Sequence, residues 1–572
     1  MPSQPKLIES PYKVDVPIND IASWVFATGT EESRRQPQYF DADHPSHCFS
    51  LQQAELYVKQ VALGLQRLGL RPNDKVLLFS PNKLYFPILL WGVIAARCVF
   101  TAVSPSAQET ELAYQLRDSE AKVVIAHTDT VSLALATGRK VGLPATSVYL
   151  FTNPGESLER THEALRPWTE IWASPEDAQR WSWHRITTIE EAQGTAAIIN
   201  YSSGTTGTPK GVELSHYNII ANSVQCVQKR SLVANTPRGG ARRARLDVSG
   251  ERWMAPLPMY HAFGQIWICM NAVQFGAKVF IMTKFDVSKY LLYLDIYRIT
   301  FATTVPVIMA MLVKHPHPES FNLKALEDVI SGSAPLSPET ASRFKNLYLR
   351  EGVGVKQGMG LTETTCSLFQ FAPDDIDDGR SIGWLNANCR AKIVPVEGED
   401  YQGTGPTGTV VGEIWVSGPN IMMGYYKKPK ETATTVVVED GERWLKTGDI
   451  GYADSKGRFF VVDRMKELLK VRGLQVSPAE LELALLQHPD IKDAAVIGAK
   501  INGGEYPRAF VVRKEGMITA NEVEELIRSR FARHKWLTAG VYFIDAIPRT
   551  ASGKVMRRLL PKEPEIRCIL YN

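Results

Sequence analysis

The sequence has few cysteines, and they form no recognisable framework. Its 572 residues include seven cysteines, an odd and dispersed set in which the spacing Cys-x-x-Cys never occurs. Zinc knuckles and disulfide-stabilised secreted domains need paired or regularly spaced cysteines. The pattern therefore indicates neither of these two classes, and it favours a reducing compartment.

Long apolar runs and an excess of one charge are also missing. The longest apolar run, Leu84 to Ala96, has 13 residues, whereas a membrane-spanning helix needs about 20. Lys and Arg number 65 against 61 Asp and Glu, so no strongly basic nucleic-acid surface is indicated. The first residues lack the basic start and apolar core of a secretory signal. We therefore expect a cytoplasmic protein with no membrane span and no nucleic-acid partner.

The apolar runs that are present predict an α/β protein. Strand-like runs occur at 75–79, 122–126, 196–201, 278–282, 327–331 and 352–357, and helical patterns such as 51–68 and 84–96 lie between most of them. Strands that alternate with helices in this way usually form parallel sheets. Sheets that are largely parallel are the expectation for residues 50–360.

The later part of the chain changes character twice. From about 390 to 463 the elements are short and strand-only, which predicts a small barrel or β-rich lobe. After 463 a helix opens at Ser477 and an amphipathic helix lies within 519–534, which predicts a compact α+β tail. We predict an N-terminal domain of residues 1–463 and a C-terminal domain of residues 464–572. The Gly- and Arg-rich stretch 236–247 is expected to be a solvated loop.

The segment from Tyr201 to His216 carries the clearest chemical signal. It reads YSSGTTGTPKGVELSH and lies between a predicted strand and a helix that Ser215 could cap. Glycines and small hydroxyl residues let backbone N–H groups approach an anion, and Lys210 adds a mobile positive charge. The segment is not a Walker A loop, because GxxxxGK[ST] is absent. It is suited to a triphosphate, with a polar turn as the alternative for an isolated motif.

The same segment resembles the signature of the adenylate-forming (ANL) superfamily, which includes acyl-CoA synthetases, 4-coumarate:CoA ligases and firefly luciferase. Further segments continue the resemblance in family order over about 350 residues. They are PMYHAFG (258–264), SGSAPL (331–336), QGMGLTET (357–364), WLKTGD (444–449), VDRMKELLKVRGLQVSPAELE (462–482) and PRTASGK (548–554). The sequence is thus similar to an acyl-CoA synthetase or 4-coumarate:CoA ligase-like enzyme.

The resemblance implies a fold and a two-step reaction. The fold would be a large N-terminal domain of two α/β sheet subdomains and a small β-barrel lobe, followed by a mobile α+β domain. A carboxylate would attack the α-phosphate of ATP to give an acyl-adenylate and pyrophosphate, and a thiol would then displace AMP. ATP, Mg2+ and coenzyme A (CoA) would be required, and the arginines of 238–245 are an alternative site for the phosphates of CoA. Because two anions meet in the first step, positioned positive charge should supply most of the catalysis.

The resemblance also assigns residues to the nucleotide and the metal. Lys554 and Thr362 would contact the reacting α-phosphate, and Glu363 would hold Mg2+. Asp449, supported by Arg464, would accept both ribose hydroxyls. Met359 stands where the plant ligases usually have tyrosine against adenine. The full predicted set for ATP and AMP is Ser202, Ser203, Gly204, Thr205, Thr206, Gly207, Lys210, Ser333, Ala334, Pro335, Gln357, Gly358, Met359, Asp449 and Arg464.

The resemblance assigns a second set of residues to the binding of the acid and of CoA and to the rotation of the C-terminal domain between the half-reactions. Lys466 would be the hinge, and Gly473 and Leu474 would face CoA. His261 would gate the acyl pocket, and no acid for a substrate amine accompanies it, which argues against an amino acid. The predicted pocket residues are Phe263, Trp267, Ile330, Gly360, Cys366 and Ser367, mostly apolar, as burying an aryl or medium-chain acid requires.

Several functions stay open at this point. The first is an acid:CoA ligase acting on a small-molecule carboxylic acid, as a monomer or weak homodimer. The second is a stand-alone adenylating enzyme that loads the phosphopantetheine of a carrier protein. The third is a non-catalytic binding protein that retains the fold, against which the intact Lys210, Glu363, Asp449 and Lys554 argue. Luciferase-type oxygenation of the adenylate is a further alternative.

Overall fold

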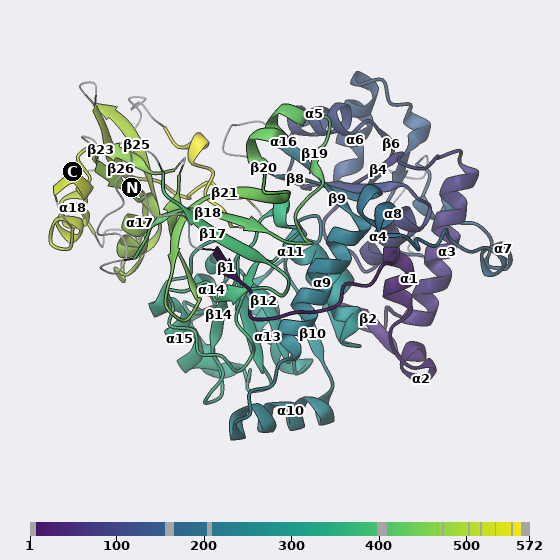
Figure 1. The fold of residues 1–572 in the computed structure, drawn as a ribbon, viewed down its shortest axis with the longest axis horizontal. Coiled ribbons are helices and arrows are strands. Elements are labelled where there is room, and N and C mark those ends of the chain that lie inside the picture. Colours follow the sequence, from purple (N-terminus) through teal and green to yellow (C-terminus); the bar gives the residue numbers. More distant parts are fainter. Residues whose placement is uncertain are drawn as a thin grey trace.

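One of two seven-stranded sheets forms the upper part of the molecule in Figure 1. The computed structural model describes residues 7–154, 165–202, 209–396, 409–465, 467–471, 474–501, 504–514, 518–531, 533–550 and 553–561. Strands β7, β6, β4, β5 and β8 pair in parallel, and β9 and β19 continue the sheet antiparallel. The strands are β4 (Lys75–Phe79), β5 (Val99–Val103), β6 (Ala121–Ala126), β7 (Val148–Leu150), β8 (Ala196–Ser202), β9 (Lys210–Ser215) and β19 (Gly424–Tyr425).

The second sheet lies below the first and is parallel except at one edge. Its order is β14-β13-β12-β10-β11-β2-β3, and only the β2–β3 pair is antiparallel. The largely parallel sheets predicted from the sequence are thus confirmed. The strands are β2 (Pro37–Asp41), β3 (Cys48–Ser50), β10 (Arg252–Ala255), β11 (Lys278–Ile281), β12 (Phe301–Thr304), β13 (Asp328–Ser331) and β14 (Val355–Gln357).

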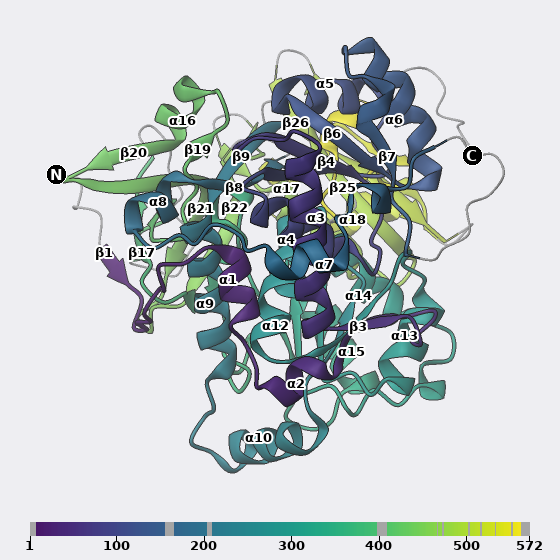
Figure 2. The ribbon, with the colours of Figure 1, turned by 90° about the vertical axis from the view of Figure 1, so that its right-hand side faces the viewer.

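Helices cover both sheets, and the sequence shows why the central ones are buried. All ten residues of α4 (Phe86–Ala95) are apolar or glycine and buried, so this helix lies inside the fold. Ser50 caps α3 (Leu51–Arg67) and Ser215 caps α9 (His216–Ser231), each through a reciprocal side-chain contact. Figure 2 shows α1, α3 and α4 close together near the centre of the view. Further helices are α1 (Ile21–Phe26), α2 (Glu31–Arg35), α5 (Glu109–Ser119), α6 (Thr128–Lys140), α7 (Pro175–Arg180), α8 (Ile189–Gly194), α11 (Ala262–Gly264), the π-helix η4 (Gln265–Asn271), α12 (Ala272–Gln274), α13 (Val287–Ile296), α14 (Pro306–Leu312) and α15 (Pro338–Tyr348).

The predicted β-rich lobe is a six-stranded antiparallel sheet that differs from the expectation at two points. One of its six strands is the N-terminal strand β1, which pairs with β17, and the lobe includes a short helix, α16, that was not predicted from the sequence. In the β21–β22 ladder, Asp449 is the partner of Arg464. The elements are β1 (Leu7–Glu9), β17 (Arg390–Val394), β18 (Gly412–Ser417), α16 (Pro429–Thr435), β20 (Val436–Glu439), β21 (Glu442–Ala453) and β22 (Phe459–Arg464).

The C-terminal segment, at the left of Figure 1, has its own small core. Buried residues between Leu469 and Leu537 form a hydrophobic cluster drawn from this segment alone. The Ser477 hydroxyl accepts from the Glu480 backbone N–H and caps the first helix, as expected. The predicted domain boundary at 463/464 stays a prediction. The elements are β23 (Leu469–Val471), β24 (Leu474–Val476), α17 (Pro478–Leu486), β25 (Ile491–Ile501), β26 (Gly504–Arg513), α18 (Ala520–Arg528) and β27 (Val541–Phe543).

The expectation of a loop at 236–247 is wrong, because this stretch forms helix α10 (Pro237–Ser249). Thr236 caps the helix and Pro237 opens it. The Arg242 guanidinium is buried and donates to both oxygens of Asp374 at 2.8 and 3.2 Å. Arg245 forms a similar fork with Glu327. Both arginines are therefore committed to internal ion pairs, and α10 lies at the lower edge of the molecule in Figures 1 and 2.

These ion pairs argue against the alternative that the stretch binds the phosphates of CoA, because Arg242 and Arg245 are already paired with carboxylates of the same chain. We expect Arg242→Ser to lower the free energy of unfolding by about 3–5 kcal/mol, because it leaves the buried Asp374 carboxylate without its partner. The KM for CoA should not change. Arg243 is the matched control, since its pair with Asp247 is exposed, and Arg243→Ser should cost less than about 1 kcal/mol. Denaturant unfolding and CoA titration measure the two effects, and a raised KM for CoA with unchanged stability would contradict this account.

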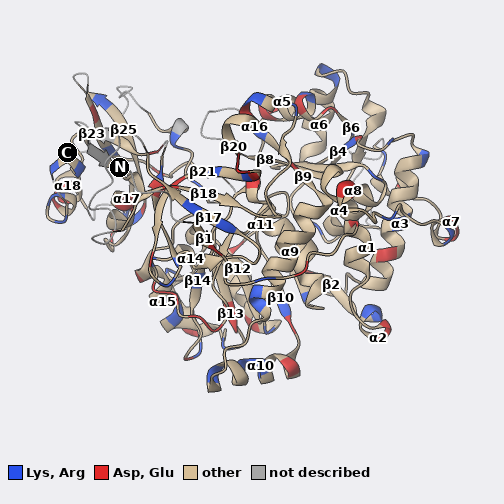
Figure 3. Ribbon diagram, in the orientation of Figure 1, with Lys and Arg blue, Asp and Glu red and all other residues tan. Residues whose placement is uncertain are grey.

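Lys and Arg positions and Asp and Glu positions are interspersed along the ribbon in Figure 3. Within the part of the chain that the structure describes, every helix is too short or too polar to cross a bilayer.

Candidate functional site

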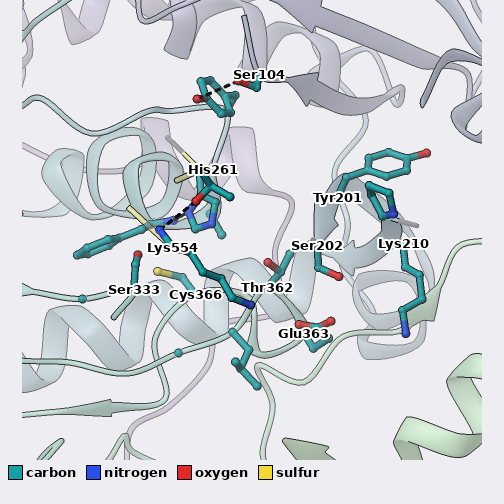
Figure 4. A pocket seen from close by; sticks show the side chains of 18 of the residues that line it. Ser104, Tyr201, Ser202, Lys210, His261, Ser333, Thr362, Glu363, Cys366 and Lys554 are labelled. Atoms are coloured by element: carbon teal, nitrogen blue, oxygen red, sulfur yellow. Dashed lines mark hydrogen bonds between the residues drawn. The ribbon is translucent and has the colours of Figure 1, made fainter. Parts of the chain in front are cut away.

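A cavity of about 1070 Å3 lies where the two sheets, the β-rich lobe and the C-terminal segment meet. Each part contributes to its lining: Ala102 and Tyr201 from the first sheet, Ile330 from the second, Gly448 from the lobe and Lys554 from the C-terminal segment. Figure 4 shows ten of the lining residues by name. Side chains separated by more than 400 positions in the sequence therefore share one space.

Most of the predicted site residues that the structure describes line this cavity. They are Ser202, Lys210, His261, Phe263, Trp267, Ile330, Ser333, Gly358, Met359, Gly360, Thr362, Glu363, Cys366, Ser367, Arg464 and Lys554. Gln357 lies behind the lining, where its side-chain oxygen accepts from the Leu336 N–H at 2.8 Å and fixes the turn that contains Ala334 and Pro335. Ser203, Gly204, Thr205, Thr206, Gly207, Lys466 and Gly473 lie outside the described residues, and only the backbone of Leu474 is described, in β24.

Glu363 is held at the cavity by a contact that the sequence reading missed. The Tyr425 hydroxyl donates to Glu363 Oε1 at 2.9 Å, and the Lys210 Nζ lies 4.1 Å from the centre of the Tyr425 ring. The Glu363 backbone carbonyl accepts from the Met422 N–H. Tyr425 lies in a plain GYY segment, in which no sequence signal marks one tyrosine as functional. Its ring links the predicted metal ligand to the predicted phosphate-binding lysine.

The donor set around Glu363 fits Mg2+ bound together with a phosphate. No group of three or more His, Cys, Asp or Glu side chains that could hold a metal occurs among the described residues. Mg2+ is commonly held by one or two carboxylates, with waters and substrate phosphates completing the octahedron. A single carboxylate, near the lysine that is predicted to bind phosphate, is that kind of site.

Asp449 is a buried carboxylate in which one oxygen accepts a hydrogen bond and the other has no partner among the described residues. Its Oδ1 accepts from Arg464 Nε at 2.9 Å, and the Asp449 side chain is 3% exposed. Within the described part of the chain, its Oδ2 has no hydrogen-bond partner. Burial raises the Asp449 pKa and the charge of Arg464 opposes that shift. A buried acceptor without a donor is costly, and a ribose diol would supply donors to it.

Lys554 is presented by a tightly closed turn. The Thr550 N–H donates to the Lys554 carbonyl at 2.8 Å, and the Lys554 N–H donates to Thr550 Oγ1 at 3.1 Å. Arg549, a residue that the sequence reading did not select, donates from Nη1 to the Gly553 carbonyl and forms a bidentate pair with Asp493 of β25. The turn is therefore fastened to the C-terminal sheet.

Burial and neighbouring charges shift the pKa of Lys554. Its Nζ lies 4.0 Å from Glu467 Oε1. Burial lowers the Lys554 pKa, the nearby Arg464 lowers it further, and Glu467 and Asp449 act in the opposite direction. Since adenylation would need the charged form, we infer that this half-reaction is lost as pH rises through a pKa below the ordinary lysine range.

The predicted acyl pocket is bounded by His261 and by η4. The Phe263 N–H donates to His261 Nδ1 at 3.3 Å, so in the neutral ring Nε2 carries the proton. Burial lowers the His261 pKa to about 4, and the ring is neutral at pH 7. Trp267 packs against Trp253 and Phe301.

The opposite wall of this pocket is tighter and more polar than the sequence suggested. A Cβ on Gly360 would lie 1.5 Å from the Cys366 carbonyl oxygen, so only glycine fits there. Ser367 and Gln370 also line the cavity. Gln370 was not predicted from the sequence, because a mostly apolar pocket was expected there.

Comparison with known proteins gives the same family for both parts of the chain. The model of the AMP-binding enzyme family matches residues 30–426, and the model of the AMP-binding enzyme C-terminal domain matches residues 480–554. The acyl-CoA ligase azaF of Aspergillus niger is 35% identical over 555 residues, which cover 96% of this chain and 98% of the relative. The phenylacetyl-CoA ligase epaB of Aspergillus niger is 34% identical over 555 residues, covering 96% and 97%.

A solved structure has the same fold. The crystal structure of ATP-bound MatB from Rhodopseudomonas palustris superposes with a TM-score of 0.76 at 24% identity, and the match covers 94% of this chain and 97% of that one. At this identity the likeness establishes the architecture.

Proposed function

The chain belongs to the AMP-binding enzyme family and is an AMP-forming acid–CoA ligase, and we propose that it joins a mainly apolar aryl or medium-chain carboxylic acid to CoA. The observation that supports the proposal is the shared cavity, whose lining includes the charged side chains of Glu363, Lys554 and Arg464 together with the aromatic side chains of Phe263 and Trp267. The name of a relative that acts on phenylacetate supports an aryl acid. Burial of such a tail stabilises the complex by about 25 cal/mol per Å2.

In the first half-reaction the acid's oxygen attacks the α-phosphorus of ATP and the bond to pyrophosphate breaks. We propose that the Lys554 ammonium binds the incoming carboxylate and an α-phosphate oxygen, which offsets the repulsion between them. Thr362 would donate to the same phosphate. Glu363 would hold Mg2+, which when bound neutralises phosphate charge, and Asp449 would accept from the ribose hydroxyls.

In the second half-reaction the CoA sulfur attacks the acyl carbon and the bond to AMP breaks. We propose that Lys466 is the hinge about which the C-terminal segment turns, so that Gly473 and Leu474 replace Lys554 at the cavity. The neutral His261 would orient the acyl group through its Nε2–H. This leaves the nucleotide bound by the same residues in both steps.

Release of pyrophosphate, measured across a panel of carboxylic acids with and without CoA, tests the function. We expect CoA to increase turnover with aryl and medium-chain acids and to yield a thioester. Adenylate formation that CoA cannot discharge, but that a carrier protein's phosphopantetheine can, would contradict CoA as the acceptor. Preference for short or strongly polar acids would contradict the proposed substrate class.

The depth of the acyl pocket should depend on Trp267, which is 2% exposed and lines the cavity. We expect Trp267→Ala to favour longer or bulkier acids by roughly 10-fold or more in the ratio of kcat/KM between two acids. The same change removes packing against Trp253 and should cost about 3–5 kcal/mol of stability. Trp267→Phe is the matched control, since it keeps an aromatic ring. An unchanged ratio in a folded Trp267→Ala enzyme would place this residue outside the acyl site.

A further inference from the structure

A side-chain amide is built into the wall of the acyl pocket with one end anchored. Gln370, at the end of the strand β15 (Phe369–Gln370), lines the cavity and is 3% exposed. Its Nε2 donates to Ser367 Oγ at 2.7 Å and to Cys226 Sγ at 3.1 Å. Both hydrogens of the amide nitrogen are thus used inside the protein.

Ser367, which accepts one of these two hydrogen bonds, is itself held in place by hydrogen bonds. The Asn222 side chain accepts from the Ser367 N–H at 3.0 Å and donates to the Ser367 carbonyl at 2.6 Å. Asn386 Nδ2 donates to Ser367 Oγ at 3.2 Å. Ser367 is therefore fixed through its backbone and its side chain, which fixes the orientation of the Gln370 amide.

The remaining polar atom of this amide is the carbonyl oxygen Oε1. Among the described residues no donor to Gln370 Oε1 is found, and both hydrogen bonds of the side-chain amide are donated by Nε2. Gln370 lines the cavity, and an acid that fills the cavity without bringing a donor would leave this amide oxygen unpaired, which costs free energy. The position therefore suits a ligand that brings a donor of its own.

The location of Gln370 identifies which part of the acid would meet it. Cys226, its sulfur partner, lies on α9, and Ser223 of the same helix is hydrogen-bonded to Asn271 of η4. Trp267 lies on η4 as well. The amide is thus connected through α9 to the helix that carries the predicted acyl-pocket residue Trp267, whereas Thr362 and Glu363 line the part of the cavity predicted for the phosphates.

We propose that Gln370 Oε1 accepts a hydrogen bond from a hydroxyl group at the end of the acid remote from its carboxylate. The preferred substrate would then be a hydroxylated acid, apolar along its length, and Gln370 would determine this specificity. The inference rests on the proposed function, because it assigns the end of the same acyl pocket.

Matched acids that differ by one distal hydroxyl test this inference. Suitable pairs are phenylacetate with 4-hydroxyphenylacetate and octanoate with 8-hydroxyoctanoate, with pyrophosphate release as the readout. We expect the wild-type enzyme to favour the hydroxylated member of at least one pair by roughly 10-fold or more in kcat/KM. Gln370→Met, which keeps the length of the side chain and removes the acceptor, should abolish or reverse that ratio.

Cys366→Ala is the comparison for a change of pocket volume, because Cys366 lines the same pocket and its truncation does not remove Gln370. We expect it to change kcat/KM for both acids of a pair and to leave the ratio between them within about threefold of wild type. The 4-methoxy analogue accepts hydrogen bonds but cannot donate one, so it should not share the preference. Equal ratios in wild type and Gln370→Met, or equal preference for methoxy and hydroxy acids, would overturn the inference. Failure of every acid to release pyrophosphate would instead count against the proposed function. If Gln370→Met does not fold, Gln370→Leu provides the same test.

Discussion

Lys554→Ala is expected to slow acyl-adenylate formation by two to three orders of magnitude, in line with the loss of a positioned charge from a polar transition state. The lysine is buried enough for burial to lower its pKa, so water cannot fully replace its charge. The turn that presents it is closed by Thr550 and by Arg549, and both contacts run through backbone atoms at Gly553 and Lys554. The substitution should therefore remove the ammonium group without disturbing the turn.

Conversion of presynthesised acyl-AMP and CoA to the thioester should survive in Lys554→Ala within a few fold, because the proposed rotation about Lys466 withdraws this residue. Single-turnover assays of each half-reaction make the comparison. Lys554→Arg keeps a charge and serves as the control for the electrostatic part. Equal loss of both half-reactions would show that Lys554 supports the structure of the segment rather than adenylation.

The fold followed from local patterns because the elements that carry it are individually well marked. The run at 75–79 is β4, and Ser50, Ser215 and Ser477 each cap the helix that follows them. A resemblance over seven motifs then placed Lys554 and Glu363 at one cavity, although they lie 191 positions apart in the sequence. Secondary-structure propensities alone could not have predicted that Lys554 and Glu363 lie close together, because their proximity depends on how the C-terminal segment packs against the rest of the chain.

The missed features depend on tertiary partners. An Arg-rich stretch is normally solvent-exposed, but Arg242 and Arg245 find Asp374 and Glu327, more than 80 positions away, and these pairs hold α10 in place. Gln370 and Tyr425 carry no motif of their own. Their significance lies in what they touch, Ser367 and Glu363, and only the folded chain brings those partners together.

Asp449→Asn is expected to raise the KM for ATP by roughly 10- to 100-fold, since it removes one ribose acceptor and the charge that makes both acceptors strong. The Arg464 contact uses Oδ1, and Oδ2, which is buried and has no hydrogen-bond partner among the described residues, is the atom that we propose meets the ribose. The free energy of unfolding should fall as well, because a neutral amide leaves the Arg464 guanidinium without its charged partner. The KM for ATP and the free energy of unfolding are therefore measured separately, and a loss of stability with an unchanged KM would indicate a purely structural role.

Deoxynucleotides locate the effect at the ribose. In the wild-type enzyme 2′-deoxy-ATP and 3′-deoxy-ATP should each bind more weakly than ATP, since each leaves a buried carboxylate lone pair without a donor. In Asp449→Asn the penalty for at least one of the two should largely disappear, because the acceptor that its hydroxyl would have met is already gone. Double-mutant-cycle analysis of KM values gives the coupling between side chain and hydroxyl. If both deoxynucleotides lose the same affinity in wild type and variant, Asp449 acts only by holding Arg464, and the ribose is bound elsewhere in the cavity.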